Sequence, residues 1–94
     1  MRCLMQAKMD TAAGSRGLAD GTLPKAIQHT LETLNPEAAY FGTLDGRRTA
    51  WIVFDFEDPA DMPRIAEPLF GIGADVQFAP VMSPDDLQRG LSRL

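Results

Sequence analysis

Apolar residues recur along this chain with two different spacings, and the spacings separate expected helices from expected strands. Apolar positions at helical spacing run from Leu23 to Leu34. They lie between Thr22, a good N-cap, and the pair Asn35-Pro36, which ends a helix. We therefore predict a helix over residues 22–34. Ahead of it, residues 11–21 contain three glycines, so the sequence favours only a weak helix there.

Four segments are typical of β-strands. The strongest is Thr49–Phe56, because its β-branched and aromatic residues fit a pleated, buried surface. Arg2–Met9 and Ala38–Leu44 are rich in apolar residues and contain no proline. Ala74–Met82 is the fourth, and Pro80 places it at a sheet edge or at a bulge.

Two further helices are expected in the second half of the chain. One begins at Asp58 or Asp61, is shortened or kinked by Pro68, and ends by Gly71. Its apolar stripe consists of Met62, Ile65, Leu69 and Ile72. The other is a short C-terminal helix that begins at Ser83-Pro84-Asp85-Asp86, where a capping serine, a first-turn proline and two acids follow one another.

The expected order of elements is therefore β-α-β-β-α-β followed by a short helix. Right-handed connections make this an α+β, ferredoxin-like arrangement. We expect a four-stranded antiparallel sheet with both main helices on one face. No linker divides the chain, so residues 1–94 are expected to form a single ferredoxin-like domain.

The pair Asp45-Gly46 predicts a two-residue hairpin and thereby a register for the two strands around it. In that register Tyr40 lies opposite Trp51, and Phe41 lies opposite Ala50. Residues opposite one another share a face of the sheet. One face then carries Cys3, Met5, Ala7, Phe41, Ile52, Phe54, Phe56, Val76 and Phe78, which we expect to meet the helices.

The opposite face is expected to carry a mixture of apolar and polar side chains. These are Leu4, Gln6, Lys8, Tyr40, Trp51, Val53, Asp55, Gln77 and Ala79. An antiparallel sheet often exposes one face to water, but a mixed aromatic and aliphatic patch normally marks an interface or a groove. Two copies that stack these faces would cover the patch and enclose a lined cavity.

Aromatic walls with a few polar groups are typical of small-ligand sites. Trp51 and Tyr40 would give flat contact surface, and Gln6, Lys8 and Gln77 would orient a polar ligand. Asp55 is a candidate general base if the cavity raises its pKa. Alternatively, Asp55 pairs with Lys8 or Arg2, and the aromatic residues only hold a dimer together.

Charge and composition exclude several classes of protein. Nine basic and thirteen acidic residues give a net charge of −4, which leaves no basic surplus for binding nucleic acid. The longest apolar run, Ala50–Phe54, is far shorter than a membrane span or a signal-peptide core. The single cysteine, Cys3, excludes an intrachain disulfide. We therefore expect a cytoplasmic protein that binds neither nucleic acid nor a membrane.

No motif predicts a metal or cofactor. His29 is the only histidine, and its place on the helix of residues 22–34 turns it away from the apolar stripe. One histidine and one cysteine are too few for a zinc site. The glycines of residues 14–17 lack the lysine and the spacing of a phosphate loop. The acidic residues 55–61 are explained in part as helix caps. Cys3 is expected to be a buried, inert thiol.

The order of elements, the Asp45-Gly46 hairpin leading into residues 51–55, and the ending Phe78-Ala79-Pro80-Val81-Met82 before a capped helix resemble the dimeric α/β-barrel superfamily. Within it, the chain is similar to small bacterial domains of unknown function akin to muconolactone-isomerase-like and YCII-like proteins. The resemblance implies a homodimer joined through its sheets around a cavity. It transfers no catalytic residue.

Two functions follow from these expectations. The first is a homodimeric small-molecule-binding protein, which the resemblance extends to a cofactor-independent isomerase or monooxygenase-like enzyme. The second is a non-catalytic interaction or structural module in which the sheet face serves only for assembly. The sequence does not name a substrate for the first.

Overall fold

An open, four-stranded antiparallel sheet organises the chain. The computed structural model describes residues 1–94. In chain order its elements are β1 (Arg2–Met9), α1 (Thr11–Asp20), α2 (Thr22–Leu34), β2 (Ala38–Leu44), β3 (Arg47–Asp55), the 3-10 turn η1 (Pro59–Asp61), α3 (Met62–Phe70), β4 (Ala74–Pro80) and α4 (Pro84–Leu91). The strands lie in the order β2-β3-β1-β4.

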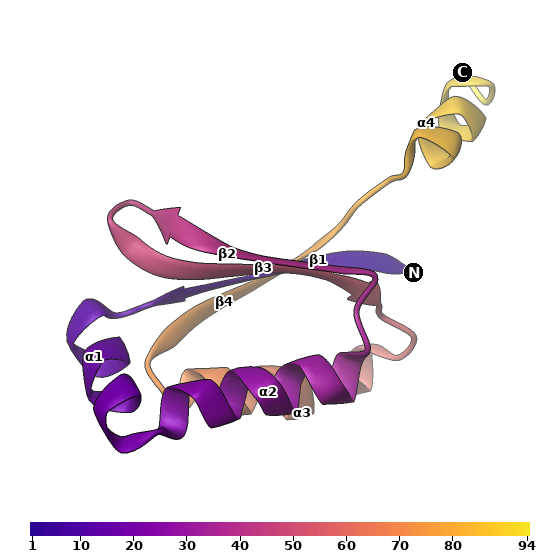
Figure 1. Cartoon of the computed structure of the whole chain (residues 1–94). Helices are drawn as coiled ribbons and strands as arrows, with labels where there is room; N and C mark the ends of the chain where they lie inside the picture. Colours follow the sequence, from indigo (N-terminus) through magenta and orange to yellow (C-terminus); the bar gives the residue numbers. More distant parts are fainter.

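The helices divide between the two sides of the sheet. Figure 1 shows α2 and α3 side by side beneath one face, whereas α4 stands away on the other side. The α+β class and the antiparallel sheet are as expected. The order of elements differs from the expected β-α-β-β-α-β, because two helices, α1 and α2, connect β1 to β2. None of the helices has the length and apolar character needed to cross a membrane.

The hairpin between β2 and β3 has the register predicted from its turn. Leu44 pairs with Arg47, and Tyr40 pairs with Trp51. Asp45 and Gly46 both have positive φ angles, 54° and 73°, as a two-residue hairpin of this kind requires. Because the register is correct, the assignment of side chains to the two faces of β2 and β3 is confirmed.

The core lies between the sheet and α2 and α3. It consists of Cys3, Met5, Ala7, Met9, Leu23, Ala50, Ile52, Phe54, Phe56, Ile65, Leu69 and Ala74. Phe54 is fully buried, and its ring lies 5.5 Å from that of Phe56. The sequence placed Phe41 on this side too, and the side is correct, but Phe41 is 53% exposed because β2 is an edge strand.

The helix α1 is complete although its glycines predicted a weak one. Asp10 caps it by accepting a hydrogen bond from the backbone N–H of Ala13 at 2.9 Å. Gly17 is buried where α1 meets α2, and a Cβ there would lie 2.9 Å from that of Leu23. The glycines that lower helix propensity therefore allow the close approach of two helices, and this packing compensates for the lower propensity.

The helix α3 begins after η1 and keeps a proline inside it. Asp58 caps η1, as its carboxylate accepts from the N–H of Ala60 at 3.0 Å. Ile65 and Leu69 are buried against the sheet, as the apolar stripe predicted. Met62, the first member of that stripe, is 40% exposed, because it lies in the first turn at the margin of the core.

Candidate functional site

The sheet face opposite α2 and α3 carries side chains in three rows that cross all four strands. We call these rows together the open face. An apolar row contains Ala38, Val53, Leu4 and Ala79; a central row contains Tyr40, Trp51, Gln6 and Gln77; a third row contains Gly42, Thr49, Lys8 and Asp75. Strand spacing of about 4.8 Å makes each row about 14 Å long.

The central row holds four of the residues that the sequence singled out for ligand binding. The registers of the three strand pairs bring them together, although they come from four different strands. Sequence reasoning assigned the face from parity alone, and the structure places all four on it. The third row adds Lys8, so the five candidate binding residues lie on one surface.

Trp51 has two close contacts with neighbouring strands. Its indole Nε1 donates a hydrogen bond to Oε1 of Gln6 at 3.2 Å. Its ring also lies against Gly42, where a Cβ would come within 3.2 Å of Cζ3. These contacts fix the position of the ring between Gln6 and Gly42, and the residue is half-buried. Tyr40, at the edge strand beside it, is 68% exposed.

Lys8, the cationic group of the open face, is paired within the chain. Lys8 Nζ lies 3.2 Å from Oδ2 of Asp45, in the hairpin turn. Gln77 is exposed on β4. Of the candidate binding residues, Gln77 and Tyr40 present the most free surface. Gln6 and Lys8 already have partners in the single chain, so a ligand would compete with these partners.

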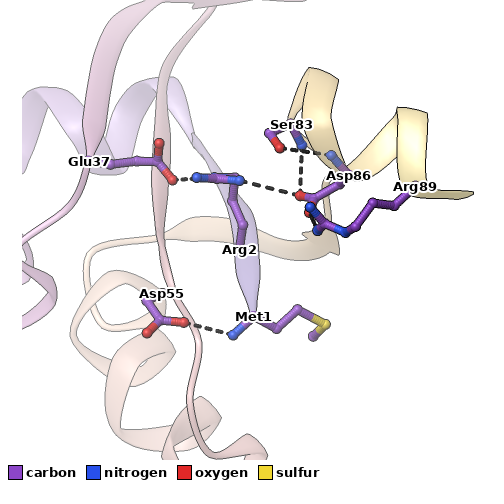
Figure 2. A network of polar contacts seen from close by, with 7 residues as sticks. All are labelled: Met1, Arg2, Glu37, Asp55, Ser83, Asp86 and Arg89. Atoms are coloured by element: carbon purple, nitrogen blue, oxygen red, sulfur yellow. Dashed lines mark hydrogen bonds and ion pairs between the residues drawn. The ribbon is translucent and has the colours of Figure 1, made fainter.

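Asp55 lies at the end of the open face and does not behave as the expected general base. Figure 2 shows its carboxylate beside the N-terminal amine of Met1, with Oδ1 at 2.7 Å from the nitrogen. The hydrogen bond and the charge of that ammonium group lower the pKa of Asp55. In the single chain the pKa of Asp55 is therefore lowered, not raised as the general-base hypothesis would need in the cavity. Arg2 lies opposite Asp55 on the neighbouring strand β1. Asp55 nevertheless forms its ion pair with the N-terminal amine, and not with Lys8 or Arg2.

A second polar network lies beside Asp55 at the same end of the sheet (Figure 2). Arg2 donates from Nε to Oε1 of Glu37 and from Nη1 to Oδ2 of Asp86, the latter at 3.4 Å. These carboxylates raise the pKa of Arg2, with the hydrogen bond to Glu37 as the largest cause. Because Arg2 alternates with Cys3 along β1, its side chain lies on the side of the open face.

A cavity of about 580 Å³ lies between α1 and the C-terminal end of α3, away from the central row of the open face. An apolar cavity of about 200 Å³ lies beside η1 and the edge of β4, and it is lined by Met1, Cys3, Phe56, Pro59, Met62, Phe78, Ala79 and Pro80. Sequence reasoning missed this cavity, because it assigned Met62 to the buried apolar stripe of the helix. Burial raises the pKa of the Cys3 thiol, as expected for an inert cysteine.

The remaining candidates carry no chemistry in the structure. His29 is exposed on α2, as predicted from its helical position. No group of three His, Cys, Asp or Glu side chains is arranged to hold a metal ion. No family model, curated protein or solved structure matches this chain.

Proposed function

We propose that this chain is a homodimeric small-molecule-binding protein in which two open faces stack around the ligand. The observation that carries this proposal is the composition of the open face. Its apolar row and the aromatic pair Tyr40 and Trp51 lie on the side of the sheet that α2 and α3 leave uncovered. Such a surface normally belongs to an interface.

We further propose that the fold is a ferredoxin-like variant with one added helix, α1. The sheet order β2-β3-β1-β4, with the first and third strands central, supports this relationship. The placement of α2 and α3 on one face supports it as well. The resemblance to dimeric α/β barrels would then extend to the way in which two copies assemble.

The central row supplies the ligand chemistry in this proposal. Trp51 offers a flat ring whose N–H is already satisfied by Gln6, so it would stack on a ligand rather than donate to it. Tyr40 and Gln77 are the exposed polar groups at the two ends of the row. The ligand that fits this row is a small, flat molecule with polar groups at its edges.

Sedimentation equilibrium at several concentrations tests the assembly. We expect a dimer that Val53→Lys dissociates, because a charge in the apolar row would be desolvated in the interface. The matched control is Phe70→Ser, which removes an exposed apolar residue of α3 on the helix side and should leave the dimer intact. A wild-type chain that is monomeric at 100 μM would contradict the proposal.

A fluorescent apolar probe, anilinonaphthalene sulfonate, tests the binding site. We expect one probe per dimer with energy transfer from Trp51, and reduced binding in a Trp51→Ala variant that is still dimeric. A dimeric wild-type protein without stoichiometric probe binding would leave only the structural role.

The alternative function is a non-catalytic dimer module. One observation favours it: Gln6 Oε1 and Lys8 Nζ already have partners within the chain. The ion pair with the N-terminal amine, which lowers the pKa of Asp55, also makes this carboxylate a weaker base. In that case Trp51→Ala would weaken the dimer and change no ligand binding.

A further inference from the structure

Residues 82–94, which we call the C-terminal arm, stand away from the rest of the molecule (Figure 1). The molecule measures 51 Å along its longest axis but only 28 Å and 17 Å along the others. Its radius of gyration is 14.7 Å, whereas a compact chain of this length has about 12 Å. The arm therefore lies outside the compact body.

The arm carries an apolar edge that its own chain does not cover. Leu87 and Leu91 are four residues apart on α4, so they lie on the same edge, and they are 46% and 56% exposed. Met82 and Leu94 extend the exposed apolar surface at the two ends of the arm.

The helix within the arm is well capped but too short to be stable alone. The Ser83 hydroxyl accepts from the N–H of Asp86 at 3.1 Å, and the Asp86 carboxylate accepts from the N–H of Ser83 at 3.0 Å. These two bonds form a capping box. However, isolated helices shorter than about 12 residues are marginal in water. The eight residues of α4 therefore need a packing partner.

The arm lies on the side of the open face. Arg2 is on that side of β1, and its bond to Asp86 is the one side-chain hydrogen bond between the arm and the body. Val81 still pairs with Arg2 through its backbone N–H at 3.1 Å, so the arm leaves the sheet directly after that residue. A molecule that covers the open face would therefore contact α4 at the border of that face.

We propose that the C-terminal arm extends over a second copy of this chain and packs the Leu87–Leu91 edge against it. This inference rests on the proposed function, because it takes the open face as the place where the second copy sits. The arm then holds the partner at the border of the stacked sheets, and the symmetry of a two-fold dimer uses the same contact twice.

The area of the open face supports a second copy held by its arms. Four strands about 4.8 Å apart and about 25 Å long give a flat area of roughly 500 Å². Side-chain relief raises the accessible area above this value. A stable dimer buries about 800 Å² on each partner. The sheet face alone is therefore at or below the lower limit, and a packed α4 from each copy adds the missing apolar surface.

Sedimentation equilibrium of the full chain separates the arm from the sheet face. We expect the double variant Leu87→Ser/Leu91→Ser to raise the dimer dissociation constant by on the order of 100-fold. The matched control, Gln88→Ser, changes an exposed residue of the same helix and should leave the constant within about threefold of wild type. If the wild type is dimeric and the double variant dimerises equally well, the inference fails while the proposed function stands.

Paramagnetic labelling tests the contact without disturbing the leucine edge. A nitroxide on Gln88→Cys of one unlabelled chain is mixed with a ¹⁵N-labelled wild-type chain. The buried Cys3 should not react with the nitroxide reagent. Wild-type protein treated with the same reagent is the control. We expect broadening of amide signals in the ¹⁵N-labelled copy. A second sample carries ¹⁵N on the nitroxide-bearing chain itself, diluted with unlabelled wild type. Broadening in this second sample but none in the ¹⁵N-labelled wild-type copy would overturn the inference, because the arm would then fold onto its own body.

Discussion

Gln6 and Trp51 lie opposite one another on β1 and β3, and the indole N–H of Trp51 donates to the Gln6 side-chain oxygen at 3.2 Å. The bond spans the centre of the open face. It fixes the largest aromatic ring of that face against Gly42 and removes its only donor from competition for a ligand. The orientation of the candidate site therefore depends on one pair of residues that are 45 positions apart.

Replacing Gln6 with alanine should release the Trp51 ring. We expect a red shift of the tryptophan emission and stronger quenching by acrylamide, because the ring loses its anchor. The free energy of unfolding should fall by about 1 kcal/mol, the usual net value of one hydrogen bond. Fluorescence and urea denaturation measure the two effects. The control is Gln77→Ala, in the same row, which leaves the Trp51 bond intact and should leave the emission unchanged.

Replacing Arg2 with alanine should loosen α4 without unfolding the body. Arg2 joins Glu37 to Asp86, and these groups are partly exposed to solvent, so the melting temperature should change little. The ¹⁵N relaxation of residues 84–91 in a dilute sample should show faster motion than in wild type. If the ¹⁵N relaxation of these residues is the same in the variant and in wild type, Arg2 does not restrain the arm.

Acid should fray α4 before it unfolds the sheet. The backbone N–H and side chain of Ser83 lower the pKa of Asp86 in the folded protein. A lowered folded pKa means that Asp86 stabilises the helix above the unfolded pKa of about 3.9. This contribution is lost as the pH falls through the lower folded value. Amide chemical shifts of residues 83–91 between pH 7 and pH 2 should therefore change in this window.

The Asp86→Asn variant provides the control for this pH dependence. Its amide cannot be ionised, so the transition of α4 below pH 4 should disappear. Persistence of the same transition in the variant would assign it to another carboxylate.

Replacing Gly73 with alanine should destabilise the body. Gly73 has a φ of +85°, and a Cβ there would lie 2.7 Å from the Cβ of Ala13 in α1. Backbone strain and overpacking together should cost about 2–4 kcal/mol. The matched control is Gly90→Ala, because no atom lies within 4 Å of that position in α4. It should be neutral or stabilise α4 by up to about 1 kcal/mol. Urea denaturation measures both.

The two-residue turn accounts for much of what could be predicted. Asp45-Gly46 fixed the register of β2 and β3, and the register fixed which side chains share a face. A one-residue shift would have moved every residue of a strand to the other face, so this local signal decided where Trp51 and Tyr40 lie. Lys8, Gln6 and Gln77 followed from parity in β1 and β4.

The errors concern contacts between residues that are distant in the sequence. The glycines of residues 11–21 lowered the helix content that we expected there. In the structure they allow α1 to pack closely against α2, and this packing stabilises α1. Asp55 was expected to have a raised pKa, but the amine of Met1 lies 2.7 Å away and lowers it. Neither effect is visible in the local pattern of either segment.

The sequence by itself determined the strands, the hairpin register and the two faces of the sheet, because periodicity and turn geometry act over a few neighbouring residues. Only the tertiary structure decided that Trp51 is anchored by Gln6, that Asp55 is held by an ammonium group, and that α4 stands on the side of the open face. These outcomes depend on which side chains meet when distant segments pack, and that pairing is set by the whole fold.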